Sequence, residues 1–473
     1  MKLEKDYFLS GKINEECGVF GIYNNQDAAS LAYFGLHALQ HRGQQAAGIA
    51  ATDGGVINCV KDKGLLAEVF NPSILETLPG KHSIGHVRYS KQQDNLIENV
   101  QPIMVRAHTG EFAVAHNGQI VNAAELKEEL EKAGSIFQGN SDSELIAHFI
   151  QNETGTFVEK IMKACQRFEG AYAFIIMTKD CMYAVRDKNG LRPLAFAKLE
   201  EGYAISSETC AFDIVNAEYI KDVEPGEVIR IAKDGVKYFK YTKETQHKMC
   251  AMEYIYFARP DSNIDGINVH TARRLSGRTL ASVETEEADI VIGVPDSSLS
   301  AAIGFAEQSG LPYEIGLIKN RYVGRTFIQP TQKQRERGVR MKLSAVKSIV
   351  SGKRVFMIDD SIVRGTTSKR IVQLLKEAGA KEVHVRIGSP ALTDPCFYGV
   401  DTSSYDELIS ARMSCDEVCK FIGADSLRFM TIEQMEQSFL TKNLCTSCFN
   451  GKYCTSLFKY GDIITEEKKR RGK

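Results

Sequence analysis

Hydrophobic and polar positions follow one pattern in the first half of the chain. Between residue 17 and about residue 240, short apolar runs at 112–115, 171–177 and 182–185 alternate with amphipathic segments such as 124–132. The apolar runs predict strands that are buried on both faces, and the amphipathic segments predict helices. We therefore expect sheets covered by helices in this part of the chain.

The second half alternates more regularly. Strand-like runs at 289–294, 355–358 and 383–387 are separated by amphipathic segments such as 301–309. This order predicts a mostly parallel sheet with helices on both faces.

Turn residues and a polar stretch precede the expected domain boundary. Glu224-Pro225-Gly226 predicts a turn, and the stretch 242–248 is polar. The expected organisation is a leader at 1–16, a first domain at 17–245 and a second domain at 246–473.

A turn rich in glycine and hydroxyl groups follows the run at 355–358. Two carboxylates, Asp359 and Asp360, come first, and Arg364-Gly365-Thr366-Thr367-Ser368 then leads into a segment with helical periodicity. Backbone N–H groups and hydroxyls at a helix N-terminus can bind phosphate, whereas carboxylates suit ribose hydroxyls and a divalent cation. A surface turn with solvated Asp residues is the plain alternative. The order strand, acidic pair, loop and helix favours a site for a phosphorylated ribose with magnesium.

This segment resembles the phosphoribosylpyrophosphate-binding motif of the type I phosphoribosyltransferases. The resemblance implies that Asp359 and Asp360 hold the ribose hydroxyls, and that the 5′-phosphate is held by Val363, Arg364, Gly365, Thr366, Thr367 and Ser368. Upstream, Pro295-Asp296-Ser297-Ser298 resembles the pyrophosphate loop of that family. The implied roles are orientation of pyrophosphate by Asp296 and Ser298, and contact with one Mg²⁺ per subunit by Ser297, Asp359 and Asp360. Alone, this tetrapeptide is more often an ordinary turn and helix cap.

The first apolar run of the chain begins at Cys17. Residues 1–16 are polar and of mixed charge, and they lack the roughly 7–15-residue apolar stretch of a secretory signal. If this leader is removed, Cys17 carries both a thiol and a free α-amine, whose reference pKa of about 7.7–8.0 suits a general base for that thiol. A lone cysteine at a strand start is more often a small buried hydrophobe. The motifs downstream favour the catalytic interpretation.

Short motifs after Cys17 supply a partner for each part of free glutamine. Arg88 has a planar fork for the α-carboxylate, and Asp142 has a negative charge for the α-ammonium. The Asn117 side chain and the Gly118 N–H are suitable donors for the oxyanion of a thioester-forming step. Each motif is weak alone, because Arg88 could equally form a surface ion pair. Together with 40–44 they resemble the N-terminal-nucleophile glutaminases, which implies catalytic Cys17, Asn117 and Gly118 and glutamine-binding Arg88, Tyr89 and Asp142.

The two halves together resemble the amidophosphoribosyltransferase family from Asn14 to about Phe458. The fold implied is α/β and α+β: a four-layer αββα glutaminase domain followed by a type I phosphoribosyltransferase domain. The sequence departs from the resemblance at residues 90–94, where relatives usually carry a small, often glycine-containing loop. Lys91 would close the glutamine site differently.

The resemblance implies that glutamine, phosphoribosylpyrophosphate and water give 5-phosphoribosylamine, glutamate and pyrophosphate, the first committed step of de novo purine synthesis. Ammonia is mostly protonated in neutral water and is then not a nucleophile, so a dry passage between the two sites would keep it reactive. The basic loop at 319–342 resembles the family's lid over the pyrophosphate, and a solvated basic loop is the alternative. Purine nucleotide inhibitors and a homo-oligomer, a tetramer being favoured, are also implied.

Twelve cysteines without a secretion signal favour thiols, metal binding or catalysis over disulfides. Cys445 and Cys448 form a CxxC pair, whose spacing alone fits zinc, an iron–sulfur cluster or redox exchange. One branch of the family binds a [4Fe–4S] cluster, and the resemblance implies one cluster per subunit, with a structural role favoured over an oxygen-sensitive switch. The implied ligands are Cys250, Cys396, Cys445 and Cys448. Cys454 is an alternative ligand, and Cys415 and Cys419, spaced i and i+4, are expected to be spare thiols; four thiolates also fit zinc.

Composition agrees with a large cytoplasmic enzyme. The chain has 473 residues, 43% of them hydrophobic and 25% charged, which is enough for two sizeable cores. A formal net charge of −1 gives no electrostatic case for nucleic acid, and no run approaches the ~18 apolar residues of a membrane span. The charged tail at 466–471 is expected to fray in solvent.

Two other function classes remain as alternatives. A phosphoribosyltransferase-fold regulator would sense the sugar phosphate without converting it, and it would not need Cys17 or the glutamine contacts. A different glutamine amidotransferase would share the first half and lack the segment 358–368.

Overall fold

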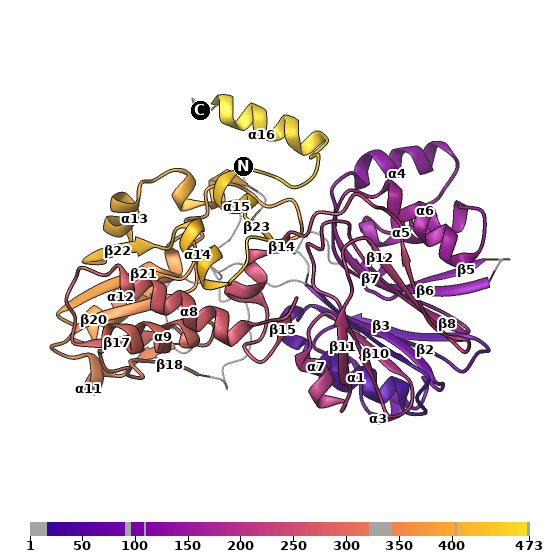
Figure 1. The fold of residues 1–473 in the computed structure, drawn as a ribbon, viewed down its shortest axis with the longest axis horizontal. Coiled ribbons are helices and arrows are strands. Elements are labelled where there is room, and N and C mark those ends of the chain that lie inside the picture. Colours follow the sequence, from indigo (N-terminus) through magenta and orange to yellow (C-terminus); the bar gives the residue numbers. More distant parts are fainter. Residues whose placement is uncertain (1–16, 90–95, 108–109, 321–342, 403, 471–473) are drawn as a thin grey trace, which may run out of the picture.

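The computed structural model describes residues 17–89, 96–107, 110–320, 343–402 and 404–470. We call residues 17–245 the N-terminal half and the described residues after 245 the C-terminal half. The two halves lie side by side, and the chain crosses between them near β14 (Figure 1). The leader, the departure at 90–94 and most of the expected lid, 321–342, lie outside the described residues.

Two antiparallel sheets form the N-terminal half. The first has, in spatial order, β11(Glu218–Asp222), β9(Ala195–Lys198), β10(Tyr203–Ser206), β1(Gly18–Tyr23), β4(His82–Arg88), β2(Ala46–Thr52) and β3(Ile57–Lys63). The second has β13(Gly235–Lys240), β12(Glu227–Ala232), β8(Cys181–Arg186), β7(Gly170–Thr178), β6(Gly110–Ile120) and β5(Ile103–Ala107).

Helices cover the outer face of each sheet (Figure 1). On the first sheet they are α1(Ala28–Ala38), α2(Leu66–Val69), α3(Pro72–Leu75) and α7(Cys210–Ile214), and on the second α4(Ala123–Lys132), α5(Asp142–Asn152) and α6(Phe157–Arg167). The space between the sheets is filled by small and branched side chains such as Val19, Ala115 and Ile175. Helix α1 packs close to the sheet, because a Cβ on Gly35 would lie 2.4 Å from the Phe20 ring.

A parallel sheet forms the centre of the C-terminal half, with the order β17(Ile290–Gly293), β20(Arg354–Asp359), β21(Glu382–Ile387) and β22(Ser426–Phe429). Successive side chains point to opposite faces of a strand. Val291 and Phe356 accordingly pack with α8(Val269–Ser282) and α9(Leu299–Ser309), whereas Ile292 and Met357 share a core with α12(Thr366–Glu377) and α13(Cys415–Ile422).

Glycines allow α8 and α9 to cross closely. A Cβ on Gly277 would lie 1.8 Å from the Ala301 carbonyl oxygen, and one on Gly304 would lie 1.9 Å from that of Arg274. No side chain fits at those distances, so this crossing requires glycine on both helices.

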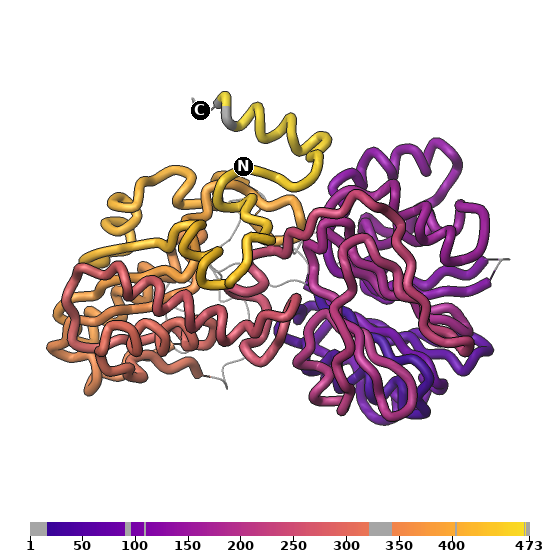
Figure 2. Tube along the Cα trace, viewed as in Figure 1, coloured from indigo at the N-terminus to yellow at the C-terminus, as the bar shows by residue number. Residues whose placement is uncertain are grey.

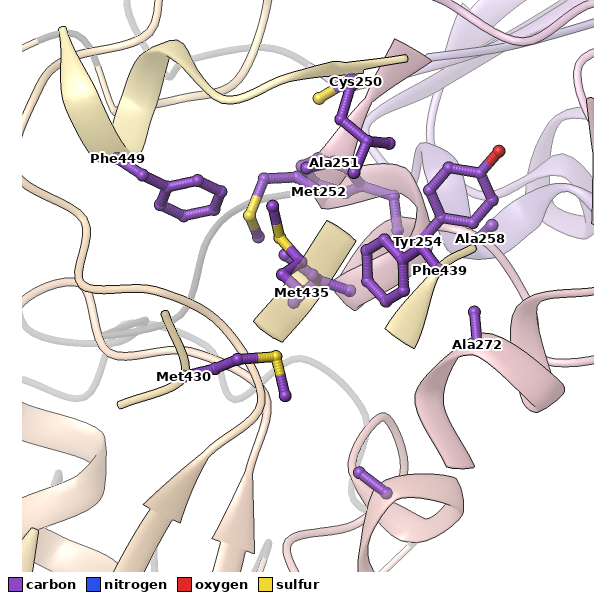
Figure 3. Close-up of a cluster of buried hydrophobic side chains, with 14 of the residues drawn as sticks. Cys250, Ala251, Met252, Tyr254, Ala258, Ala272, Met430, Met435, Phe439 and Phe449 are labelled. Atoms are coloured by element: carbon purple, nitrogen blue, oxygen red, sulfur yellow. The ribbon is translucent and has the colours of Figure 1, made fainter. Parts of the chain in front are cut away.

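The C-terminal segment returns to pack on the crossover between the halves. Strand β14(Met249–Cys250) pairs in parallel with β23(Leu444–Cys445), and a π-helical turn, η4(Glu253–Phe257), follows β14. Figure 3 shows Met252 and Tyr254 packed against Met435 and Phe439, which belong to the region of α14(Ile432–Ser438). The Tyr254 and Phe439 ring centroids are 5.2 Å apart. The crossover is therefore held by a core of its own.

The remaining elements are short: β15(Asn263–Ile264), β16(Ile267–Asn268), β18(Leu317–Lys319), β19(Leu343–Ala345), α11(Lys347–Val350), α15(Ser447–Asn450) and the 3₁₀ turns η1(Gln40–Arg42), η3(Ile97–Asn99), η5(Tyr405–Glu407) and η6(Ile409–Ala411). No helix in the described part of the chain is long and apolar enough to cross a membrane.

The expected fold class is confirmed, and the expectation for the tail was wrong. The charged tail continues a helix, α16(Lys459–Arg470), which in the trace extends from the boundary between the halves over the C-terminal half (Figure 2). Glu466 precedes Lys469 by three positions, a spacing that stabilises helices. Tyr460 at its start stacks on Phe397, with ring centroids 4.8 Å apart.

Candidate active sites

Cys17 lies immediately before β1, the central strand of the first sheet. Its Sγ is half-buried and lies 3.7 Å from the carbonyl oxygen of Tyr89. Arg42 Nε donates to the Cys17 carbonyl oxygen at 3.1 Å. The backbone of this cysteine is thus held by β1 on one side and by a buried guanidinium on the other.

Asn117 and Gly118 lie near the end of β6, opposite Ala173 and Tyr172 of β7. Gly118 has φ 136°, and a Cβ there would lie 2.1 Å from the Ala171 carbonyl oxygen, so the position requires glycine. The Asn117 side-chain amide is buried and has no hydrogen-bond partner among the described residues. A buried unpaired donor is costly unless a ligand uses it, which suits a site for a developing oxyanion.

Two buried histidines flank this region, and both are neutral. Burial, assisted by the charge of Arg88, lowers the pKa of His86 to about 3, and burial also lowers the pKa of His116. His86 Nε2 lies 3.0 Å from the His116 carbonyl oxygen. Because these imidazoles bind protons so weakly, they are poor general bases, and the α-amine of Cys17 remains the candidate for that role.

The two candidate glutamine-binding charges come from separate elements. Arg88 ends β4, and the loop after η1 presses against its backbone, since a Cβ on Gly43 would lie 2.6 Å from the Arg88 carbonyl carbon. Asp142 begins α5, accepts a hydrogen bond from Ile120 N at 2.8 Å and lies 3.8 Å from His116 Nδ1. The structure therefore brings Asp142 to the end of β6, beside Asn117 and Gly118.

The candidate sugar-phosphate site is built by two loops at the carboxyl ends of neighbouring strands. Ser298 Oγ donates to Asp359 Oδ1 at 3.1 Å, and Ser297 Oγ donates to the Asp360 carboxylate. Both carboxylates are buried. The loops after β17 and β20, far apart in the sequence, thus meet as the parallel-sheet rule requires.

The predicted phosphate loop turns sharply into α12. Gly365 has φ 72°, and a Cβ there would lie 2.9 Å from Ile409 Cδ1. Thr366 begins the helix, so Thr366, Thr367 and Ser368 form its first turn. The Val363 side chain is buried, and its carbonyl accepts a hydrogen bond from Ile409 N at 2.8 Å. Val363 therefore anchors the loop through its buried side chain and its backbone carbonyl.

A cavity adjoins the acidic pair and contains an arginine that sequence reasoning missed. Ser297, Ser298 and Asp360 line it together with Arg273, Ile255 and Phe439. Burial lowers the pKa of Arg273 to about 10, with the Asp360 charge acting in the opposite direction. Arg273 lies among other arginines in α8, so nothing in the sequence distinguished it from a surface charge.

The four cysteines named as cluster ligands line one cavity. Cys250, Cys396, Cys445 and Cys448 face it together with Arg192 and Tyr398. Cys250 and Cys445 are register partners in the β14–β23 pair, and burial followed by the three neighbouring thiols raises the pKa of Cys448. Cys454 contacts Cys445 but is not among the residues that line the cavity. Cys415 and Cys419 lie on α13, where their Sγ atoms donate to nearby carbonyl oxygens.

Comparison with known proteins agrees with this division. A glutamine amidotransferase domain model matches residues 86–213, and a phosphoribosyl transferase domain model matches residues 268–388. Amidophosphoribosyltransferase from Bacillus subtilis is 53% identical over 455 residues, covering 94% of this chain and 96% of that protein. The Staphylococcus aureus (strain N315) enzyme of the same name is 48% identical over 457 residues, covering 95% and 92%. The chain belongs to the amidophosphoribosyltransferase family.

Solved structures of this family share the fold. The B. subtilis glutamine phosphoribosylpyrophosphate amidotransferase complexed with ADP and GMP superposes with a TM-score of 0.90 at 53% identity, covering 93% of this chain and 98% of that one. A structure described as the allosteric regulatory enzyme of purine biosynthesis gives the same TM-score and identity, with 93% and 97% covered.

A buried group of charges between the halves was also missed from the sequence. Arg42 Nη1 donates to Glu208 Oε1 at 2.6 Å, and its two Nη atoms donate to both Glu253 oxygens at 2.9 and 2.7 Å. Burial opposes ionisation of Glu208, but His41 and Arg42 hold its pKa well below the usual range. A second contact joins Tyr89 Oη to Asp401 Oδ2 at 3.0 Å. The neighbourhood of Cys17 is therefore completed by the carboxylates of Glu253 and Asp401 from the C-terminal half.

Proposed function

We propose that this chain converts phosphoribosylpyrophosphate, glutamine and water into 5-phosphoribosylamine, glutamate and pyrophosphate, as the first committed step of purine synthesis. The observation that carries the proposal is that one chain contains both sites. In the N-terminal half, the buried amide of Asn117 has no hydrogen-bond partner among the described residues, and in the C-terminal half Asp360 of the acidic pair lines a cavity. A regulator that only senses the sugar phosphate has no use for the first of these.

In the glutaminase step, Cys17 attacks the side-chain amide of glutamine while its own α-amine accepts the thiol proton. This step requires removal of residues 1–16, which we propose as a propeptide, with the domain boundary at 245/246. Asn117 Nδ2 and Gly118 N–H stabilise the oxyanion, and Arg88, Tyr89 and Asp142 hold the amino-acid end of the substrate. Ammonia leaves, and water hydrolyses the thioester to glutamate.

In the second half, ammonia displaces pyrophosphate at C1 of the sugar. Asp359 and Asp360 orient the ribose, Asp296 and Ser298 orient the pyrophosphate, and the first turn of α12 with Arg364 and Gly365 holds the 5′-phosphate. Lys319 Nζ, at the start of the expected lid, lies 3.0 Å from Asp296 Oδ2. Buried carboxylates and a hydroxyl suit magnesium, which Ser297, Asp359 and Asp360 would hold and which would offset the charge of the leaving group.

We propose that Cys250, Cys396, Cys445 and Cys448, which line one cavity, hold a [4Fe–4S] cluster with a structural role between the crossover and the C-terminal segment. Four thiolates also fit a zinc ion, so the choice of iron rests on the family resemblance. Among the described residues, no group of three or more His, Cys, Asp or Glu is placed to hold a metal ion.

Effectors and assembly follow from the family. The B. subtilis relative is described in complex with ADP and GMP. We propose that purine nucleotides inhibit this chain as well, that it works in the cytoplasm, and that it forms a homo-oligomer, with a tetramer favoured.

Replacing the nucleophile tests the proposal. Cys17→Ala should abolish glutamine-dependent synthesis and leave ammonia-dependent synthesis of phosphoribosylamine at high pH, because only the first half uses the thiol. Cys59→Ala, at another half-buried cysteine of the same half, is the matched control and should retain both activities. Loss of both activities in folded Cys17→Ala protein would overturn the division of labour.

A further inference from the structure

The guanidinium of Arg42 is held between two buried carboxylates from different halves. Arg42, Glu208 and Glu253 are all 1% exposed or less. Glu208 belongs to the N-terminal half, whereas Glu253 begins the turn η4 in the C-terminal half. Glu253 alone engages both Nη atoms, and such a two-point contact fixes the plane of a guanidinium as well as its position.

The third nitrogen of that guanidinium reaches the backbone of Cys17. With the plane of Arg42 set by Glu253, its Nε points to the Cys17 carbonyl oxygen at 3.1 Å. The position of this backbone matters more than usual, because the proposed function makes the α-amine of Cys17 the general base for its own thiol. A small rotation of the Cys17 backbone would displace base and nucleophile together.

Glu253 is held in turn by contacts close to the sugar-phosphate cavity. Arg273 lines that cavity and donates to the backbone oxygens of Tyr254, the second residue of η4, at 2.7 Å and of Ala258, the residue after η4, at 2.9 Å. Tyr254 also packs on Phe439, another residue of the cavity wall (Figure 3). Arg192 Nη1 lies 3.5 Å from Glu253 Oε1 and completes the charge balance around it.

From this geometry we infer that Glu253 is a positioning residue for the glutaminase reaction: a carboxylate of the phosphoribosyl half that, through Arg42, sets the place of Cys17. This inference rests on the proposed function of Cys17. It assigns Glu253 no contact with glutamine or with the sugar. Its loss should lower the reactivity of the thiol without weakening the binding of the amino-acid substrate.

The test measures the nucleophile directly with a diazoketone analogue of glutamine, which alkylates the catalytic thiol. Glu253→Gln keeps the shape of the side chain and removes its charge. We expect the maximal alkylation rate of Cys17 to fall about 10- to 100-fold, the scale of a small misplacement of a catalytic group, while the half-saturating analogue concentration changes less than about twofold. Ammonia-dependent synthesis should remain within about twofold, because the sugar site is untouched.

Two further variants keep the test decisive if Glu253→Gln folds poorly. Glu253→Asp retains the charge but shortens the side chain by one methylene, and it should give a smaller fall in the same rate. Arg42→Lys removes the fork, and combining it with Glu253→Gln should add little further loss, because both act through one contact. Glu284→Gln is the control, since Glu284 forms a comparable two-point ion pair with buried Arg386 within the C-terminal half.

The outcomes are distinguishable. An unchanged alkylation rate in both Glu253 variants, an equal fall in Glu284→Gln, or a matching fall in ammonia-dependent synthesis would overturn the inference. Cys17→Ala protein that still hydrolysed glutamine would instead overturn the proposed function, whatever the result at Glu253.

Discussion

The two candidate sites are assembled in different ways. The sugar-phosphate site consists of two loops that follow neighbouring parallel strands, and Ser298 of one loop donates directly to Asp359 of the other. The candidate glutaminase site collects Cys17 from the residue before β1, Arg88 from β4 and Asn117 from β6, which belong to two antiparallel sheets. Parallel strands bring their carboxyl ends to one edge, so a motif after each strand is enough to form a site. An antiparallel site depends on the fold around it, and here that fold includes Glu253 from the other half.

The largest expected effect is on ammonia-dependent synthesis, because two adjoining loops alone form the sugar-phosphate site. Asp359→Asn or Asp360→Asn should lower ammonia-dependent synthesis by about 100-fold or more, because each removes a carboxylate that we propose to orient the reacting sugar. Glutamine hydrolysis measured without the sugar phosphate should be unaffected. Asp289→Asn is the control, because Asp289 lies at the amino ends of the strands whose carboxyl ends carry the site, where it forms an ion pair with Arg354. Equal losses of synthesis and basal glutaminase activity in a stable Asp360→Asn protein would contradict the separation of the sites.

The cysteine cavity links the crossover to the C-terminal segment, so the proposed cluster should stabilise the whole chain. Protein purified without oxygen should be brown and contain about four iron atoms per chain. Cys448→Ser should lower iron content and cost roughly 2–5 kcal/mol of unfolding free energy, by the logic of a crosslink that closes a long loop, and gradual inactivation in air is expected for the parent protein. Iron analysis and thermal unfolding measure both effects.

Cys454→Ser is the matched control for this prediction, since Cys454 lies beside Cys445 outside the cavity lining. It should retain iron and stability. Stoichiometric zinc without iron would overturn the cluster. Unchanged iron in Cys448→Ser together with loss of iron in Cys454→Ser would show that Cys454, and not Cys448, is the fourth ligand.

A smaller effect is expected where carboxylates of the two halves meet. Burial first, and then the charge of Asp265, raises the pKa of Asp222 from 3.8 to about 6. A carboxyl whose pKa is raised by folding stabilises the protein below its unfolded pKa, and this contribution is lost as pH rises through about 6. Asp222→Asn should therefore raise unfolding free energy by about 1–3 kcal/mol at pH 8 and by little at pH 4.5.

Thermal unfolding at the two pH values measures this difference. Asp234→Asn is the control: exposed Asp234 has its pKa lowered to about 2 by Lys237 and Arg230, so its contribution does not change between pH 4.5 and 8. If Asp222→Asn changes the unfolding free energy by the same small amount at both pH values, Asp222 does not carry a destabilising buried charge at pH 8.

Much of the C-terminal half could be predicted from the sequence because its information is local. The run 355–358 is buried on both faces, its loop carries the acidic pair, and α12 begins directly after Gly365, with the hydroxyl residues in its first turn. In the N-terminal half, Cys17, Asn117 and Gly118 could be proposed through the order of several short motifs, and the two-sheet fold was confirmed.

The interactions that the sequence could not predict join elements that are distant in the chain. Arg42 was recognisable as part of a motif, but its partner Glu253 lies 211 positions away. Arg273 is one of several arginines in α8, and only the fold shows that it is buried beside Asp360 in the cavity wall. The charged tail was expected to fray, whereas α16 extends through it to Arg470.

The transfer of nitrogen from one half to the other is the central claim, and an isotope experiment tests it directly. Glutamine labelled with ¹⁵N in its side-chain amide is supplied with phosphoribosylpyrophosphate and Mg²⁺ in buffer that contains unlabelled ammonium at neutral pH. We predict equal amounts of glutamate, pyrophosphate and phosphoribosylamine, with the ¹⁵N retained in the phosphoribosylamine. Glutamate formed without matching pyrophosphate, or phosphoribosylamine that carries the unlabelled nitrogen of the buffer, would contradict the account.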